Sequence, residues 1–307
     1  MKNRHTKHHR RDFLKNISLA ATGIVVAGAY ADPLQALTLN TAKQRYKIAV
    51  CDWMILKRQK LSAFQLAEDL HADGIELDMG GLGSRETFDS KLSDPEEVKK
   101  FLEASRSTGV GISSIAMSGF YAQSFAERPT VDRMVQDTAD TMKAMNVKVA
   151  FLPLGVQGDM VKHPELRPKI IERLRQAAAK VKKAGGVIAV ETSFDAAEEK
   201  KFLEEVGSRH IKSSFNFANA VAHGKDISEE LQVLGKKHIA QIHCSNTDGV
   251  WLENDRQIDM PAVKRTLDLM NWKGWLIVER SRDVNRVRDV KANYGANVAY
   301  LKSVFTG

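Results

Sequence analysis

The chain has 307 residues, of which 43% are hydrophobic and 27% charged, as in an ordinary soluble globular protein. The formal net charge of +8 is concentrated at the amino terminus: residues 1–31 carry six Lys or Arg and one acidic residue, which leaves +3 for the remainder. So small a surplus is too mild to argue for a nucleic acid or a membrane surface as partner, and neither is expected. The length suits one α/β barrel or two small domains.

Residues 1–31 have the order of an export signal. Basic residues lead into Arg10–Lys15 (RRDFLK), an apolar run follows, and a small–x–small cleavage site ends at Ala31. The RRDFLK segment resembles the twin-arginine motif, which exports proteins that fold before they cross the membrane. The apolar run is shorter than the roughly 20 residues that a membrane span needs, so export is favoured over an anchor. We expect an exported, periplasmic protein without a membrane span after signal removal, and a loose leader over residues 32–45.

From residue 46 onward, strand-like apolar runs alternate with amphipathic helical stretches, which is typical of a parallel α/β fold. The expected strands are Tyr46–Val50, Gly74–Leu77, Gly111–Ala116, Lys148–Leu152, Val187–Val190, Ile211–Phe215, His238–Ile242 and Leu276–Val278. The expected helices are Ser62–His71, Pro95–Ser107, Thr130–Met145, Glu165–Ala184, Ala196–Val206, Ile227–Leu234, Pro261–Met270 and Asp283–Val304. Eight strands and eight helices without a linker predict a single (β/α)8 TIM barrel over residues 46–307. The alternative, an open doubly wound sheet, normally has a glycine-rich turn after its first strand, and here that turn is Cys51–Met54.

Four polar residues end or directly follow successive strands of the second half. Glu191, Asn216, His243 and Glu279 are separated by 25, 27 and 36 residues, about one strand–helix unit each. In a barrel the carboxyl ends of the strands form the active-site face, so these side chains are expected to meet. Their oxygen-rich set suits Mn²⁺, Mg²⁺ or Co²⁺, with Zn²⁺ as a further candidate. Taken singly, each is more often a surface charge or a turn residue, and it is their shared placement that predicts a metal site.

Two cysteines exclude a disulfide framework. Cys244 follows His243 on the same strand, so the two side chains point to opposite faces. Cys51 lies on the first strand, two strands from the seventh in a closed barrel, which exceeds disulfide reach. We expect two free thiols, with Cys244 packing against the helices if His243 faces the interior.

The chain resembles the xylose-isomerase-like barrels of the sugar phosphate isomerase/epimerase family, most strongly from Val187 onward. The resemblance covers roughly residues 46–305 and is carried by short segments after Val187: Ala189–Glu191, Phe215–Asn219, Ala240–His243, Ile258–Val263 and Gly274–Glu279. It implies that Glu191, Asn216, His243 and Glu279 hold a divalent metal ion. It also implies that Glu191 and Glu279 are the catalytic acid/base pair, which removes and returns a proton beside a sugar carbonyl.

The chain departs from the family at two places. Asn216 stands where the family usually has Asp, which removes one negative charge although an amide oxygen can still coordinate. Asn219 replaces the His that ketose 3-epimerases place there. Both departures argue against an ordinary ketose epimerase.

Further residues are candidates for binding the sugar. They are Trp53, Glu76, Asn219, Asn246, Asp248 and Trp251, with Met54, Phe120 and Tyr121 as further walls of a pocket. Each has a structural alternative: loop packing for the aromatic residues, an ion pair for Glu76, and turn chemistry for Asn246 and Asp248. Arg280 and Arg282 are expected to solvate the barrel rim rather than bind an anion.

Three functions compete. The first is a metal-dependent sugar isomerase or epimerase. The second is a lyase or hydratase acting on 3-keto-glycosides or related oxidised sugars, which the export signal favours because sugar phosphates are cytoplasmic. The third is a non-catalytic sugar-binding barrel. DNA-repair endonucleases of the same fold need several histidines for three zinc ions, and here only His243 ends a strand. A small-molecule sugar is therefore the expected partner, and a homo-oligomer is compatible with the sequence.

Overall fold

A computed structural model describes residues 45–306 of the chain. The predicted export signal, residues 1–31, and the leader up to residue 44 lie outside the described residues, so both stay predictions. Among the described helices, none has the length and apolar character needed to cross a bilayer.

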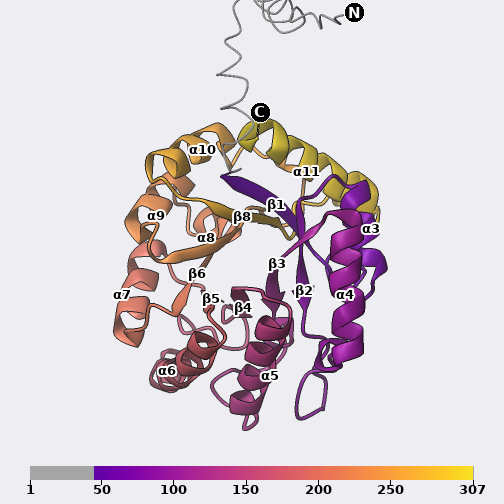
Figure 1. Ribbon diagram of the computed structural model, residues 1–307. Coiled ribbons are helices and arrows are strands. Elements are labelled where there is room, and N and C mark those ends of the chain that lie inside the picture. The colour runs from indigo at the N-terminus through magenta and orange to yellow at the C-terminus, as the bar shows by residue number, and fades with distance from the viewer. Residues whose placement is uncertain (1–44, 307) are drawn as a thin grey trace, which may run out of the picture. The chain divides into compact units, whose positions relative to one another are not determined.

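Eight parallel strands close into a barrel in the order β1 to β8, with helices around the outside (Figure 1). The strands are β1 Tyr46–Cys51, β2 Gly74–Asp78, β3 Gly111–Ala116, β4 Val149–Pro153, β5 Val187–Glu191, β6 Ile211–Asn216, β7 Ile239–His243 and β8 Gly274–Val278. Pairing of β1 with β8 over Tyr46–Val50 completes the ring. The predicted (β/α)8 TIM barrel is confirmed.

The α-helices follow the strands as expected, with one addition. They are α3 Ser62–Asp69, α4 Pro95–Thr108, α5 Val131–Ala144, α6 Arg167–Lys183, α7 Ala196–Val206, α8 Phe217–Ala222, α9 Ile227–Leu234, α10 Met260–Leu269 and α11 Val290–Phe305. The prediction of a single helix between β6 and β7 is wrong, because the short helix α8 begins directly after Asn216. Its six residues are too few to show a helical period.

The closing helix starts seven residues later than expected. We predicted it from Asp283, but α11 begins at Val290, where the Asp289 side chain accepts a hydrogen bond from the Ala292 N–H. The Asp283 N–H instead donates to Asn293 Oδ1 at 2.8 Å. The segment from Asp283 to Asp289 therefore forms a loop at the carboxyl end of β8, beside the face where active sites of barrels lie.

Alternation along the strands separates the barrel interior from the layer under the helices. On β7, Gln241 and His243 contact Glu76 across the interior, whereas Ile242 and Cys244 belong to the core between barrel and helices. Cys51 lies in the separate interior cluster. Both cysteines are free and buried, as predicted.

Trp275 of β8 packs against the start of β2 at the amino-terminal end of the barrel. A Cβ added to Gly74 would lie 2.5 Å from its ring, so only glycine permits this approach of β2. The Lys47 Nζ sits 5.2 Å from the centre of the same ring. The polar side chains of the interior gather toward the other end.

Glu199 is a carboxyl group buried between α7 and the strands, 6% exposed. Thr192 Oγ1 donates to its Oε2 at 3.2 Å, while its Oε1 has no hydrogen-bond partner among the described residues. Burial outweighs the hydrogen bond from Thr192 and raises the pKa of Glu199 to about 8. The folded protein therefore holds a proton near neutral pH that the unfolded chain releases.

Because the folded-state pKa is raised, this group's contribution to stability is largest at acidic pH and declines as pH rises toward 8. We expect Glu199→Gln to remove this decline. The free energy of unfolding of the variant minus that of the wild type should grow with pH between about 5 and 8, by at most about 1.4 kcal/mol per pH unit. Urea unfolding at several pH values measures it. Glu204→Gln, on the exposed face of the same helix, is the matched control, and an equal slope for both variants would contradict the prediction.

Candidate active site

The structure brings the four strand-end residues together at the carboxyl end of the barrel. Glu191, Asn216 and His243 are the last residues of β5, β6 and β7, and Glu279 directly follows β8. All four are at most 8% exposed. The backbone of Glu279 is fixed on both sides: its N–H donates to Ser245 Oγ at 3.1 Å and its carbonyl accepts from Tyr294 Oη at 2.8 Å.

His243 lies at the centre of the site, between carboxylates on both sides of its ring. Its Nδ1 is 3.2 Å from Glu191 Oε2 and 3.5 Å from Glu279 Oε2. Its Nε2 is 3.1 Å from Oε2 of Glu76 on β2. Phe151 packs against the ring, with 4.6 Å between ring centres. One imidazole thus connects the barrel interior with the strand-end carboxylates.

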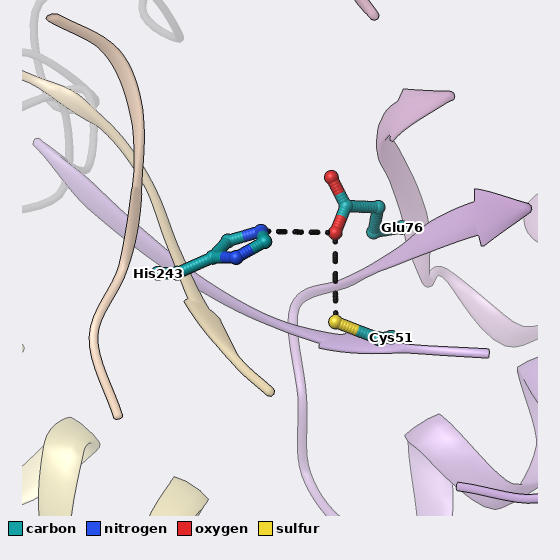
Figure 2. A group of neighbouring side chains, drawn as sticks. All are labelled: Cys51, Glu76 and His243. Atoms are coloured by element: carbon teal, nitrogen blue, oxygen red, sulfur yellow. Dashed lines mark hydrogen bonds and ion pairs between the residues drawn. The ribbon is translucent and has the colours of Figure 1, made fainter. Parts of the chain in front are cut away.

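Glu76 is fully buried beneath His243 and accepts hydrogen bonds at both oxygens. Figure 2 shows its Oε2 receiving contacts from His243 Nε2 and from Cys51 Sγ, the latter at 3.5 Å, while the second ring nitrogen of His243 points away from it. Its Oε1 accepts from Ser114 Oγ at 2.7 Å and from Gln241 Nε2 at 2.9 Å. Because a carboxylate only accepts, the His243 Nε2 must carry the proton of this bond.

That assignment leaves Nδ1 of His243 as the atom available to a metal ion. It is buried and makes no hydrogen bond of acceptable geometry among the described residues. Ligand atoms of Glu191, His243 and Glu279 lie within 4.8 Å of one another. A buried, unpaired imidazole nitrogen facing two carboxylates is a donor set that fits a divalent ion, with the carboxylate of Glu76 orienting the ligand from behind.

Burial and mutual contacts shift the pKa values of His243, Glu191 and Glu279. Burial lowers the pKa of His243, but the charge of Glu76 and the contacts with Glu191 and Glu279 outweigh burial and raise the pKa well above its ordinary value. Burial raises the pKa of Glu191. It has the same effect on Glu279, but there the contacts with His243 and Tyr121 prevail and hold the pKa below its usual range.

Asn216 uses both atoms of its amide group. Its Oδ1 accepts from the Ala218 N–H at 2.9 Å, which caps α8, and its Nδ2 donates to Glu191 Oε2 at 2.9 Å. The side chain thus touches the predicted metal-binding cluster through its nitrogen.

Aromatic side chains cover the site from the strand-end loops. The Tyr121 hydroxyl donates to Glu279 Oε1 at 3.0 Å. Trp53 stacks parallel to Phe151, with 6.4 Å between ring centres. Tyr121 and Trp53 therefore lie at the site, whereas Phe120 is buried in the core.

Three more of the predicted sugar-binding residues, Asn219, Asn246 and Trp251, donate hydrogen bonds to other groups of the protein. Asn219 Nδ2 donates to the Thr192 carbonyl at 2.6 Å, and Asn246 Nδ2 donates to Asp255 Oδ2 at 2.8 Å. Trp251 Nε1 donates to Asn293 Oδ1 at 2.9 Å.

Asp248 pairs with both arginines of the rim. Its Oδ2 is 3.0 Å from Arg280 Nη2 and 2.6 Å from Arg282 Nη2. These pairs outweigh the effect of burial and lower the pKa of Asp248 to about 2.

Sequence reasoning missed the support beneath the site. Ser114, Gln241 and Cys51 bind Glu76, and none of them was singled out for this role. The strand pattern could have indicated Gln241, because it lies two residues before His243 and its side chain therefore points to the same face of the strand. Nothing comparable indicates Ser114 or Cys51, since their contact with Glu76 depends on how β1, β2 and β3 align.

Comparison with known proteins agrees with this architecture. The family profile described as xylose isomerase-like TIM barrel matches residues 64–304. No curated protein sequence matches the chain.

Several solved structures share the fold. One is D-psicose 3-epimerase from Clostridium cellulolyticum H10 with D-tagatose, at 11% identity and a TM-score of 0.68 over 84% of this chain and 99% of that one. The 3-keto-D-glucoside 4-epimerase of E. coli has 14% identity and a TM-score of 0.64, covering 85% of this chain and 100% of its own. A sugar phosphate isomerase/epimerase from Parabacteroides distasonis has 13% identity and a TM-score of 0.65, covering 86% of this chain and 96% of its own.

The fold and the strand-end cluster define an α/β barrel with a buried carboxylate–imidazole centre. The chain belongs to the xylose isomerase-like TIM barrel family.

Glu76→Gln tests whether the buried carboxylate holds the centre together. Gln has one acceptor oxygen and an NH₂ group, so at least one of the four donors around it loses its partner. We expect the free energy of unfolding to fall by roughly 2–4 kcal/mol, the range for a buried charge left without its partner. Guanidinium unfolding measures it. Glu103→Gln, which breaks an exposed pair with Arg106, should produce no measurable change, and an equal effect of the two variants would refute the assignment.

Proposed function

We propose that this protein is a metal-dependent sugar isomerase or epimerase that abstracts a proton beside a sugar carbonyl. The observation that carries the proposal is the cluster of Glu191, His243 and Glu279, whose ligand atoms lie within 4.8 Å of one another around an unpaired imidazole nitrogen. Family membership and the epimerases of the same fold support it.

The residues that would hold the ion are Glu191, His243 through Nδ1, and Glu279. Two carboxylates and one imidazole suit Mn²⁺, Mg²⁺ or Co²⁺, with Zn²⁺ as a further candidate. When bound, such an ion polarises a carbonyl and stabilises the negative charge that proton abstraction places on the neighbouring oxygens.

The chain's own groups supply the proton transfer. Glu191 and Glu279 approach His243 Nδ1 from β5 and from the end of β8. One takes the proton from the carbon beside the carbonyl, and the other returns a proton. Return to the opposite face of the same carbon gives an epimer, and return to the neighbouring carbon gives an isomer. Trp53 and Tyr121 cover the site, which keeps water from the carbanion.

The substrate in this proposal is a free or glycosidic sugar rather than a sugar phosphate. That choice rests on the predicted export signal and a periplasmic location, since phosphorylated sugars are cytoplasmic metabolites.

Exchange of substrate protons with solvent tests the chemistry. We expect the Mn²⁺-loaded protein, incubated with ketoses or 3-keto-glucosides in deuterated water, to place deuterium on the carbon beside the carbonyl, as NMR would detect. Glu191→Gln and Glu279→Gln should each slow exchange by at least about 100-fold, the contribution of a positioned acid or base. Chelation of the metal should abolish exchange and Mn²⁺ should restore it. Metal-independent exchange would contradict the proposal, and the absence of both exchange and bound metal would leave a sugar-binding barrel.

Tyr121 favours a second candidate, a lyase or hydratase acting on 3-keto-glycosides. Burial and the charges of Glu191 and Glu279 raise the pKa of Tyr121 well above its ordinary value, so the phenol stays protonated. Elimination of a group β to the carbonyl needs a proton donor for the leaving oxygen, and a phenol beside Glu279 offers one.

Product analysis separates the two candidates. If the enzyme eliminates, a 3-keto-glucoside should release its aglycone, and Tyr121→Phe should slow release by about 100-fold while leaving deuterium exchange nearly unchanged. If it epimerises, exchange proceeds without release. Trp53→Phe is the control for disturbed packing at the same rim. Release unaffected by Tyr121→Phe would remove the phenol from the reaction.

A further inference from the structure

We infer that Asn216 is not a metal ligand but a hydrogen-bond donor that positions Glu191, so that this chain holds its metal with three protein ligands: Glu191, His243 and Glu279. The inference rests on the metal site of the proposed function and deepens it. It concerns the one position where the chain departs from the ligand set expected of its family.

The orientation of the Asn216 amide is fixed from the side of α8. Asn216 is the N-cap of this helix, and the N–H of Ala218 donates to its Oδ1 at 2.9 Å. A backbone N–H can pair only with an oxygen, because the amide NH₂ offers no acceptor. The oxygen is therefore held toward the helix.

The opposite side of the amide faces Glu191. The Nδ2 donates to Glu191 Oε2 at 2.9 Å, and a carboxylate oxygen can only accept. Rotating the amide by half a turn would place oxygen against oxygen and N–H against N–H, with loss of both hydrogen bonds in a buried site. Two independent partners thus demand the same orientation.

The atom that Asn216 turns to the cluster therefore cannot coordinate. The nitrogen of an amide has its electron pair delocalised into the carbonyl and is not a metal ligand in proteins, which use amides through oxygen. Its NH₂ group instead restrains the Glu191 oxygen that also approaches His243 Nδ1 at 3.2 Å. In this arrangement Asn216 orients a ligand from outside the coordination sphere.

This assignment changes the charge and the openness of the site. Glu191 and Glu279 together neutralise a divalent ion, whereas an aspartate in place of Asn216 would add a third negative charge. Three protein ligands leave more positions for substrate oxygens, as in catalytic rather than structural metal sites. The less neutralised ion is also the stronger Lewis acid toward a carbonyl.

The substitution Asn216→Asp distinguishes a donor from a ligand. The carboxylate of this variant would keep the helix cap with one oxygen and turn a charged oxygen to the cluster in place of the NH₂ group. In the metal-free protein this oxygen would face Glu191 with like charge, and in the loaded protein it would become a fourth ligand. Asn216→Ala and Asn216→Ser remove the amide, and Ser retains a cap for α8.

The experiment is Co²⁺ titration of the purified protein, followed by visible absorption, with Mn²⁺ affinity from calorimetry. Co²⁺ absorption reports the number and type of ligands and needs no substrate. We expect the wild type, Asn216→Ser and Asn216→Ala to give the same Co²⁺ spectrum, because their ligand set is the same, with Mn²⁺ affinity lowered about tenfold in the latter two. Asn216→Asp should change the spectrum and bind Mn²⁺ more tightly than the wild type.

Two further variants complete the design. His243→Ala removes a ligand and should abolish the wild-type spectrum. Asp226→Ala removes the cap of α9, where the Asp226 side chain accepts from the Glu229 N–H, and should lower the melting temperature without altering the spectrum. It is the matched control for losing a cap away from the site.

The inference is overturned if Asn216→Ala or Asn216→Ser changes or abolishes the Co²⁺ spectrum as His243→Ala does, or if Asn216→Asp leaves it unchanged. If the wild type binds neither ion and Asn216→Asp binds both, metal dependence of the proposed function and the three-ligand site both fail, and only the assignment of Asn216 as a hydrogen-bond donor stands. If neither protein binds, both fail.

Discussion

The hydrogen bond between Glu76 and His243 is the interaction on which the rest of the site depends. It joins β2 to β7 across the barrel interior at 3.1 Å, between two side chains that are completely buried. Because Glu76 accepts at Nε2, the ring presents Nδ1 to Glu191 and Glu279. Without this bond neither the tautomer nor the orientation of the His243 ring would be fixed, and either ring nitrogen could face Glu191 and Glu279.

The same bond explains why the barrel tolerates so much buried charge. Three carboxyl groups surround one imidazole, and such groups are stable in a protein interior only when hydrogen-bonded or neutralised. Ser114, Gln241 and Cys51 satisfy Glu76, while Tyr121 and Asn216 each donate to one of the other two glutamates. These hydrogen bonds hold the strand-end carboxylates close to one another around His243.

Much of this architecture could be predicted from the sequence. The alternation of strands and helices predicted the barrel, and the strand-end positions indicated which four polar residues would meet, because in a parallel barrel all strands end on one face. The role of Glu76 was open between sugar binding and an ion pair, since its donors come from β1, β3 and β7 and no local pattern aligns them. The sequence did not predict helix α8, because six residues are too few to show a helical period. For the same reason it did not predict the orientation of Asn216, which caps this helix.

Asn216 shows how a short element of secondary structure can determine the chemistry of a site. The amide oxygen of Asn216 caps α8, so the amide nitrogen is the atom that faces Glu191. An aspartate has two equivalent oxygens, so one can cap a helix while the other accepts or coordinates. An asparagine has only one oxygen, and once that oxygen caps the helix, the remaining NH₂ group can only donate. A single exchange of oxygen for nitrogen therefore alters the charge beside Glu191 while the barrel, the helix and the cap remain the same.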